Sequence, residues 1–271
     1  MKSNWAFDQK AYEQLNKARE AVVRDLIAQL KVVLPFATAV DIGCGVGHFS
    51  NVLDSLGLNV LGLDAREQNV LEARRRYPHI RFEVMNVEDL RLLQFGQFDL
   101  VFCFGLLYHL ENPFQSIRNM SSMTTQVALL EGVCYPSRES MMVLVDEDDL
   151  DDQGVNNIAF YPTETCLIKM LFRSGYTYCF LPRSMPDHPF YNPPEGPFRY
   201  RTLLVASKHP LKLASLIPQA VPISELRAWH LVPMRTVGKR ASKLLDFLET
   251  IARPKRTAMR TQHSASPKGE K

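Results

Sequence analysis

The 271-residue sequence lacks the long apolar segments of exported or membrane-spanning proteins. Its first residues, MKSNWAFDQK, contain no apolar stretch like that of a signal peptide. No run of about eighteen apolar residues occurs anywhere in the chain. We therefore expect a cytoplasmic protein with no membrane partner.

Cysteine is scarce, and its spacing fits neither a disulfide framework nor a zinc site. The five cysteines are an odd number, include no C-x-x-C pair, and mostly lie in apolar segments: Cys44, Cys103, Cys134, Cys166 and Cys179. Because no histidine or cysteine stands at the short spacings of structural zinc sites, we expect buried, reduced thiols and no metal.

Net charge is also small, at +3, with 23% charged residues. That value does not by itself indicate a nucleic-acid or membrane partner. The charge is concentrated at residues 251–271, where six Lys or Arg stand against one Glu. This tail can steer the protein to RNA or only improve solubility, and we favour solubility.

The 46% apolar residues suffice for a well-buried domain, and their order favours an α/β fold. An amphipathic helix is expected from Asp8 to Leu34. Seven apolar segments read as strands, at 39–42, 59–63, 80–84, 100–104, 127–131, 176–180 and 202–207. Helical segments separate the first five, so we predict a doubly wound, mostly parallel, Rossmann-like sheet with an antiparallel last strand.

The predicted organisation has four parts. They are an N-terminal helical segment at 1–36, the main domain at 37–208, a C-terminal helical extension at 209–252 and a basic, disordered tail at 253–271. The acidic run at 146–152 is interpreted as a solvated loop. The stretch at 181–200, rich in proline and aromatic residues, is either a functional loop over the site or a small satellite core.

The segment VDIGCGVGHFS, residues 40–50, follows an apolar strand and opens a helix. Gly43, Gly45 and Gly47 allow a sharp turn and the close approach of a ligand. The dinucleotide fingerprint requires its third glycine at the position of His48, which disfavours an NAD-dependent oxidoreductase, the more remote alternative. Asp41 can hold a cationic amino group, directly or through water, and would repel a pyrophosphate.

Two further polar sites follow the next strands. Asp64 ends a strand seventeen residues after Gly47, where an acid can bind both hydroxyls of a ribose. Asn86, Val87 and Glu88 follow the strand at 81–84, at the carboxyl edge where such sheets bind ligands. Each polar residue can also be a cap or turn residue, and their joint order carries the functional interpretation.

In that order these motifs resemble the class I S-adenosylmethionine-dependent methyltransferases, over roughly Val40 to Ser207. The resemblance implies an enzyme that binds S-adenosyl-L-methionine, with the residue after the fourth strand, Phe104 or Gly105, contributing main-chain contacts. The predicted cofactor-binding residues are Asp41, Gly43, Gly45, Gly47, Asp64, Ala65, Asn86, Val87, Glu88 and Phe104.

Three segments, GLLYHLENP, NNIAFYPTETCLIKMLFRSGY and YRTLLVASK, are similar to the tRNA wobble-uridine carboxymethyltransferases. That likeness implies carboxy-S-adenosyl-L-methionine as cofactor, with Tyr108 and Arg201 meeting its carboxylate. In that family further Lys and Trp contacts come from a longer N-terminal portion, whereas basic residues before Asp41, Arg19 among them, read here as the polar face of a helix. We therefore favour ordinary S-adenosylmethionine, in which case Arg201 can simply pair with surface acids.

His109 is the candidate catalytic base, because imidazole accepts a proton near neutral pH. The alternative is a histidine that is satisfied by a backbone carbonyl at a helix start. The expected reaction is methyl transfer to an oxygen or nitrogen nucleophile, which depends mainly on alignment. The sequence leaves open whether the acceptor is a small molecule or RNA, and it does not indicate the oligomeric state.

Overall fold

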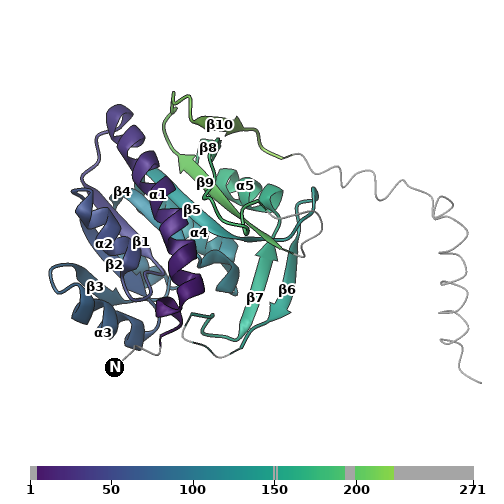
Figure 1. Cartoon of the computed structure of the whole chain (residues 1–271). Helices are drawn as coiled ribbons and strands as arrows, with labels where there is room; N and C mark the ends of the chain where they lie inside the picture. Colours follow the sequence, from purple (N-terminus) through teal and green to yellow (C-terminus); the bar gives the residue numbers. More distant parts are fainter. Residues whose placement is uncertain (1–4, 149, 151, 193–198, 223–271) are drawn as a thin grey trace, which may run out of the picture. The chain divides into compact units, whose positions relative to one another are not determined.

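The computed structural model describes residues 5–148, 150, 152–192 and 199–222 (Figure 1). The chain divides into two compact units, Met1–Ser224 and Glu225–Lys271, and the fold described here is that of the first. The predicted basic tail and all of the helical extension from residue 223 onward lie outside the described residues.

An eight-stranded sheet in the order β10-β8-β9-β5-β4-β1-β2-β3 forms the centre of the first unit. Five strands are parallel: β1 (Thr38–Ile42), β2 (Asn59–Asp64), β3 (Arg81–Val84), β4 (Phe98–Phe104) and β5 (Thr124–Cys134). The others are β8 (Tyr178–Pro182), β9 (Tyr200–Ser207) and β10 (Leu216–Gln219). Because β9 runs antiparallel to both β5 and β8, the predicted mostly parallel sheet with an antiparallel late strand is confirmed.

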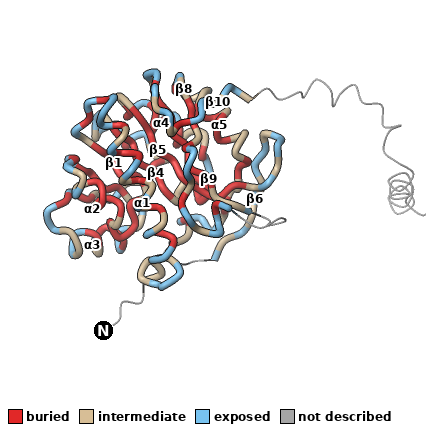
Figure 2. The backbone as a smooth tube through the Cα atoms, turned by 45° about the horizontal axis from the view of Figure 1, so that its top comes forward, coloured by how far each residue is buried: buried red, intermediate tan, exposed pale blue. Residues whose placement is uncertain are grey.

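Helices cover both faces of this sheet, as the doubly wound prediction required (Figure 1). The helices are α1 (Lys10–Val33), α2 (His48–Ser55), α3 (Glu67–Arg76), α4 (Pro113–Met123) and α5 (Glu164–Arg173), with short 3-10 turns η1 (Ala6–Asp8), η2 (Leu90–Phe95) and η3 (Leu107–His109). Alternate residues of β4 face opposite ways, so Leu100 and Phe102 pack with α1 and α2 whereas Val101 and Cys103 pack with α4 and α5. Figure 2 shows the resulting run of buried residues along the central strands.

Two features of the fold differ from the sequence prediction. A separate hairpin of β6 (Met142–Asp146) and β7 (Ile158–Pro162) was not predicted, although the first four residues of β6 are apolar. In the structure the residues of β6 alternate between half-buried and exposed. The prediction of a helical extension at 209–252 is wrong at residues 216–219, because these residues form β10 and pair antiparallel with Cys179–Pro182. A four-residue edge strand is too short to show a period of its own.

The strand order places the carboxyl ends of β1 to β4 at one edge of the sheet. The chain moves outward from β1 to β2 and β3, and then returns to the other side of β1 with β4 and β5. The order therefore reverses between β1 and β4, and ligands of open α/β sheets bind in the crevice beside such a point.

The turn that leaves β1 is fixed by a buried carboxyl. Asp41 is 2% exposed, and its Oδ2 accepts a hydrogen bond from the Ser50 hydroxyl of α2 at 2.7 Å. Burial raises the pKa of Asp41 to about 7, although the hydrogen bond from Ser50 opposes the change. The group therefore binds its proton more tightly in the folded chain than in the unfolded chain.

We expect Asp41→Asn to stabilise the protein relative to wild type as pH rises from about 4 to 7. The folded-state pKa of Asp41 lies above the unfolded value, so the wild type loses stability as pH rises through this window, whereas the amide does not titrate. The difference in unfolding free energy should grow by up to about 4 kcal/mol and level off above pH 7. Urea unfolding across this range measures it, with exposed Asp25→Asn as the control. Parallel stability curves for wild type and Asp41→Asn would contradict the prediction.

Candidate functional site

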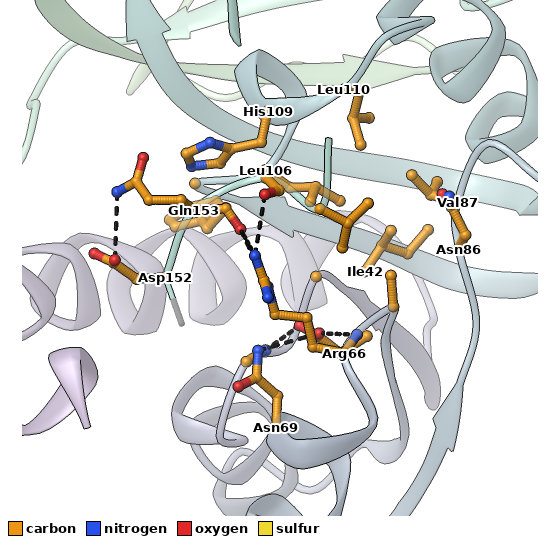
Figure 3. Close-up of a pocket in the computed structure, with 18 of the residues that line it drawn as sticks. Ile42, Arg66, Asn69, Asn86, Val87, Leu106, His109, Leu110, Asp152 and Gln153 are labelled. Atoms are coloured by element: carbon orange, nitrogen blue, oxygen red, sulfur yellow. Dashed lines mark hydrogen bonds between the residues drawn. The ribbon is translucent and has the colours of Figure 1, made fainter. Parts of the chain in front are cut away.

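A cavity of about 710 Å³ opens at the carboxyl edge of the sheet and is called the first cavity below (Figure 3). Its lining comes from the segments that follow β1, β2, β3 and β4, from the N-terminal segment, and from the loop between β6 and β7. Seven of the predicted cofactor-binding residues line it: Gly43, Gly45, Asp64, Ala65, Asn86, Val87 and Phe104. The four strand ends thus converge as the sequence order indicated.

The glycine turn needs left-handed backbone and close packing. Gly43 and Gly45 have φ of 75° and 53°, which L side chains rarely adopt. A Cβ on Gly45 would stand 2.9 Å from the ring of Phe7, and a Cβ on Gly43 would stand 2.9 Å from Leu106. Gly47 also has a positive φ, of 87°, but it caps α2 and packs against Phe82 and Tyr77.

Asp64 holds two segments of the cavity wall together. Its Oδ2 accepts from the Gly45 amide at 2.9 Å, and its Oδ1 accepts from the Arg66 amide at 2.9 Å and from Asn69 Nδ2 at 3.2 Å. Burial raises the pKa of Asp64, and these hydrogen bonds act against the shift. Since a carboxylate offers about four acceptor directions, the three bonds leave capacity for a hydroxyl of a ligand.

Asn86, Val87 and Glu88 have different positions at the end of β3. Asn86 and Val87 line the first cavity, and Figure 3 places them on the opposite side from His109. Glu88 instead accepts from the Asn112 amide at 2.6 Å and from Asn112 Nδ2 at 3.1 Å, at the start of α4. Asp41 is likewise directed toward α2 through its bond with Ser50. Glu88 and Asp41 therefore support the walls in the described structure.

A second cavity of about 850 Å³ adjoins the first and shares part of its lining. The residues common to both are Tyr12, Gly105, His109, Asp152 and Gln153. Tyr108 and Arg201, which the likeness to the carboxymethyltransferases assigned to a carboxylate, line the second cavity. Their side chains contact each other, with Arg201 Nη2 donating to the Tyr108 hydroxyl at 2.8 Å.

His109 lies where the two cavities meet, and a buried carboxylate holds its ring. The Nδ1 atom is 2.7 Å from Glu147 Oε2, with the two side chains 7% and 4% exposed. The same oxygen accepts from the Gly154 amide at 3.1 Å. If Nδ1 carries the proton that bonds Glu147, Nε2 is left as an acceptor. Glu147 corrects the interpretation of residues 146–152 as a solvated loop, because its carboxylate, directly after β6, is buried against His109.

The loop after Glu147 connects the imidazole to the first cavity. Arg66 Nη2 donates to the Gly154 carbonyl at 3.0 Å and to the Gln153 carbonyl at 3.3 Å (Figure 3). A Cβ on Gly154 would stand 2.7 Å from the carbonyl oxygen of His109. A glycine is therefore required for the loop to pack this closely on η3.

A buried ionic cluster reaches the second cavity through Arg201, the one member that lines it, and we call Arg19, Glu131, Tyr191 and Arg201 the Glu131 cluster. Arg19 Nη2 lies 2.9 Å from Glu131 Oε2, and Arg201 Nη1 lies 3.0 Å from Glu131 Oε1. The Tyr191 hydroxyl donates to the same Oε1 at 2.5 Å. Burial opposes ionisation of Glu131, but Arg19 and Arg201 together hold its pKa below the ordinary value. All three charged groups are therefore ionised.

The Glu131 cluster corrects two expectations. Arg19 does not belong to the polar face of its helix: its side chain is 3% exposed, because α1 lies across the sheet and turns this residue inward with Leu15 and Val23. Arg201 pairs with buried Glu131 and not with surface acids. Arg19 stands four residues from both Leu15 and Val23, so the helical period places it on the buried face of α1. The sequence prediction put it on the polar face because its side chain is charged.

Neither a metal site nor a membrane span is found among the described residues. In the described part of the chain, no group of three or more His, Cys, Asp or Glu residues is arranged to hold a metal ion. Across those same residues, no helix combines the length and the apolar character needed to cross a membrane.

Comparison with known proteins agrees with this geometry. Residues 40–127 match the family Methyltransf_11, described as methyltransferase domain. Over 119 residues the chain is 34% identical to a ubiquinone biosynthesis O-methyltransferase of Xanthomonas campestris pv. campestris (strain B100), covering 42% of this chain and 48% of that one. It is 29% identical over 152 residues to a tRNA U34 carboxymethyltransferase of Actinobacillus succinogenes, covering 52% and 45%. The chain thus spans about half the length of these relatives.

Solved structures share the fold at low sequence identity. The N-terminal domain of EvdMO1 with S-adenosylhomocysteine (SAH) bound has a TM-score of 0.57 at 18% identity, covering 72% of this chain and 80% of that one. Magnesium protoporphyrin IX methyltransferase from Synechocystis PCC 6803 with bound SAM has a TM-score of 0.51 at 21% identity, covering 74% and 85%. Residues 40–127 thus match a methyltransferase domain, and the chain shares its Rossmann-like fold with methyltransferases of known structure.

Proposed function

We propose that this protein transfers a methyl group from S-adenosyl-L-methionine to an oxygen or nitrogen nucleophile of an acceptor. The observation that carries the proposal is the meeting of the two cavities at His109, beside the carboxyl ends of β1 to β4. One cavity has the glycine turn and the ribose acid, and the other is open to an acceptor. Such an arrangement brings a donor and a nucleophile together in one orientation, which lowers the barrier of a two-substrate reaction.

The residues of the first cavity fit this cofactor. Asp64 has acceptor capacity left for a ribose hydroxyl, and Gly43 and Gly45 supply the left-handed turn that lines the cavity. Asn86 and Val87 are assigned to the adenine edge. When bound, the cofactor supplies an electrophilic methyl group on a sulfonium, whose departure as a neutral thioether drives the transfer.

His109 is assigned as the base that takes the proton of the acceptor. Glu147 bonds Nδ1 and thereby favours the tautomer in which Nε2 is an acceptor. Gly154 donates to Glu147, and Arg66 donates to the carbonyl of Gly154, so the loop between β6 and β7 fixes the carboxylate from both sides. Glu147 is then a positioning residue, while His109 touches the reacting group.

The second candidate is tRNA wobble-uridine carboxymethyl transfer from carboxy-S-adenosyl-L-methionine. It is favoured by the contact between Tyr108 and Arg201 in the second cavity and by the similarity to a tRNA U34 carboxymethyltransferase. Burial of Arg19 beside Arg201 supplies a further cation near this position. Ordinary S-adenosylmethionine remains our proposal.

Replacing Asp64 should weaken binding of S-adenosylhomocysteine. Asp64→Ala removes charge-assisted hydrogen bonds to the ribose, and we expect a loss of roughly 1 to 3 kcal/mol by calorimetry. Asp25→Ala, an exposed acid on α1, is the matched control and should bind as wild type does. Unchanged affinity in a folded Asp64→Ala protein would remove Asp64 from the ribose site. Tighter binding of NAD than of S-adenosylhomocysteine would refute the methyltransferase proposal.

Replacing the base should slow transfer without weakening cofactor binding. With any hydroxyl acceptor that the wild type methylates, we expect His109→Gln to lower kcat by about 100-fold or more, and Glu147→Gln by about tenfold. Acceptors whose hydroxyl is already ionised at the assay pH should lose far less, because they need no base. Exposed His79→Gln is the control. Equal losses for ionised and neutral acceptors would assign His109 a structural role.

A further inference from the structure

The second cavity carries information about the acceptor, on the condition that the proposed function holds. We propose that the acceptor is a planar aromatic molecule with a hydroxyl group at one end and a carboxylate at the other. Its hydroxyl meets His109, its ring lies between the tyrosines of the second cavity, and its carboxylate meets Arg201 and Tyr108.

Aromatic side chains make up much of the wall of the second cavity. Five aromatic side chains line it: Tyr12, Tyr108, Tyr161, Phe190 and Tyr200. The ring of Tyr108 lies 4.0 Å from the imidazole of His109 and 6.0 Å from the ring of Tyr161. Flat aromatic ligands gain stacked and edge-to-face contacts in such surroundings, in addition to the burial of apolar area.

The Glu131 cluster, which reaches this cavity through Arg201, carries an excess of one buried positive charge. Within the Glu131 cluster two guanidinium groups, of Arg19 and Arg201, share one carboxylate. The pKa of Tyr108 is raised by burial, so its hydroxyl stays protonated and adds no negative charge. Since unpaired buried charge costs several kcal/mol, an anion that enters here improves the charge balance.

Arg201 retains the means to bind that anion. A guanidinium carries five N–H groups, and the contacts of Arg201 with Glu131 and Tyr108 amount to three hydrogen bonds. The Tyr108 hydroxyl accepts from Arg201 and so can donate its own hydrogen to a carboxylate. Arg199, whose guanidinium lies 5.8 Å from the ring centre of Tyr161, adds a second cation to the lining.

Negative groups of the second cavity lie toward the first one. Glu147 is bonded to His109 and to the Gly154 amide. Asp152 lines both cavities and accepts from Gln153 Nε2 at 3.3 Å. The acids are thus grouped with His109 and the first cavity, whereas Arg201 contacts Tyr108 and Arg199 contacts Tyr161.

An acceptor carboxylate fits this geometry better than a carboxylate of the cofactor. His109 and Arg201 both contact the ring of Tyr108, at 4.0 and 5.4 Å, and no hydrogen bond between them is found among the described residues. A carboxylate attached to the transferred carbon would lie beside the nucleophile and therefore beside His109. A carboxylate across an aromatic ring from the nucleophile would instead reach Arg201.

The reaction balances without a further reagent. The acceptor oxygen forms a bond to the methyl carbon as the bond from that carbon to sulfur breaks. The sulfur keeps the electron pair and leaves as a neutral thioether, and the hydroxyl proton passes to Nε2 of His109. The carboxylate of the acceptor takes no part in this exchange and serves only to orient the ring.

Binding of three matched probes to the full chain loaded with S-adenosylhomocysteine tests the inference. 4-Hydroxybenzoate has both features, 4-hydroxybenzamide lacks the charge, and 4-hydroxycyclohexanecarboxylate lacks the planar ring. We expect the first to bind at least about tenfold more tightly than either of the others in calorimetry. Equal affinities, or no binding of any probe, would overturn the inference.

Variants identify the group that recognises the charge. Arg201→Gln should weaken binding of the benzoate by about tenfold and change binding of the benzamide by less than about twofold. The double variant Arg201→Gln, Glu131→Gln keeps the cluster's net charge and guards against a fold defect, and it should show the same loss of preference. Exposed Arg183→Gln, outside both cavities, is the control. An undiminished preference for the benzoate in both Arg201 variants would exclude Arg201 and overturn the inference.

A competition between S-adenosylmethionine and its carboxylated form distinguishes the two sources of a carboxylate. If Arg201→Gln weakens only the carboxylated cofactor and leaves the preference for benzoate unchanged, the carboxylate belongs to the cofactor and the inference is overturned. Failure of wild type to bind S-adenosylhomocysteine would instead refute the proposed function. The two failures are therefore separate results.

Discussion

The pairing of buried Glu131 with Arg19 and Arg201 joins three parts of the chain that are distant in sequence. Glu131 lies in β5, Arg201 lies in β9, and Arg19 lies in α1. Tyr191, from the proline-rich segment before β9, donates to the same carboxylate. A buried ion pair contributes little net stability, but removal of one partner is costly. This cluster therefore fixes where α1 crosses the sheet, and with it one wall of each cavity.

The remaining geometry of the site depends on a loop that lies outside the central sheet. The hairpin of β6 and β7 brings Glu147 to His109, and Arg66 anchors the following residues beside Asp64. Movement of this loop would change the first cavity and the orientation of the imidazole together. The ribose acid and the candidate base thus share one support, although they belong to different motifs in the sequence.

Parallel-strand order and the glycine turn were accessible from the sequence, and the errors have identifiable causes. Gly43 and Gly45 follow an apolar strand, Asp64 ends another, Asn86 follows the strand at 81–84, and parallel strands end at one edge of a sheet. Glu147 was missed because it stands in an acidic run, where charge normally indicates solvent. β10 was not predicted because its residues 216–219 are too few to show a period. The burial of Arg19 was not predicted because its charge was given more weight than its spacing from the apolar residues of α1.

The sequence by itself determined the doubly wound sheet and the convergence of the glycine turn with Asp64 and Asn86. These follow from local patterns, because apolar periodicity and turn residues act over a few positions. Only the tertiary structure decided which charges are buried together. The contacts of Arg19 with Glu131 and of His109 with Glu147 join residues 112 and 38 positions apart. Such contacts leave no periodic signal, since they depend on how packed elements cross and not on the spacing within any one of them.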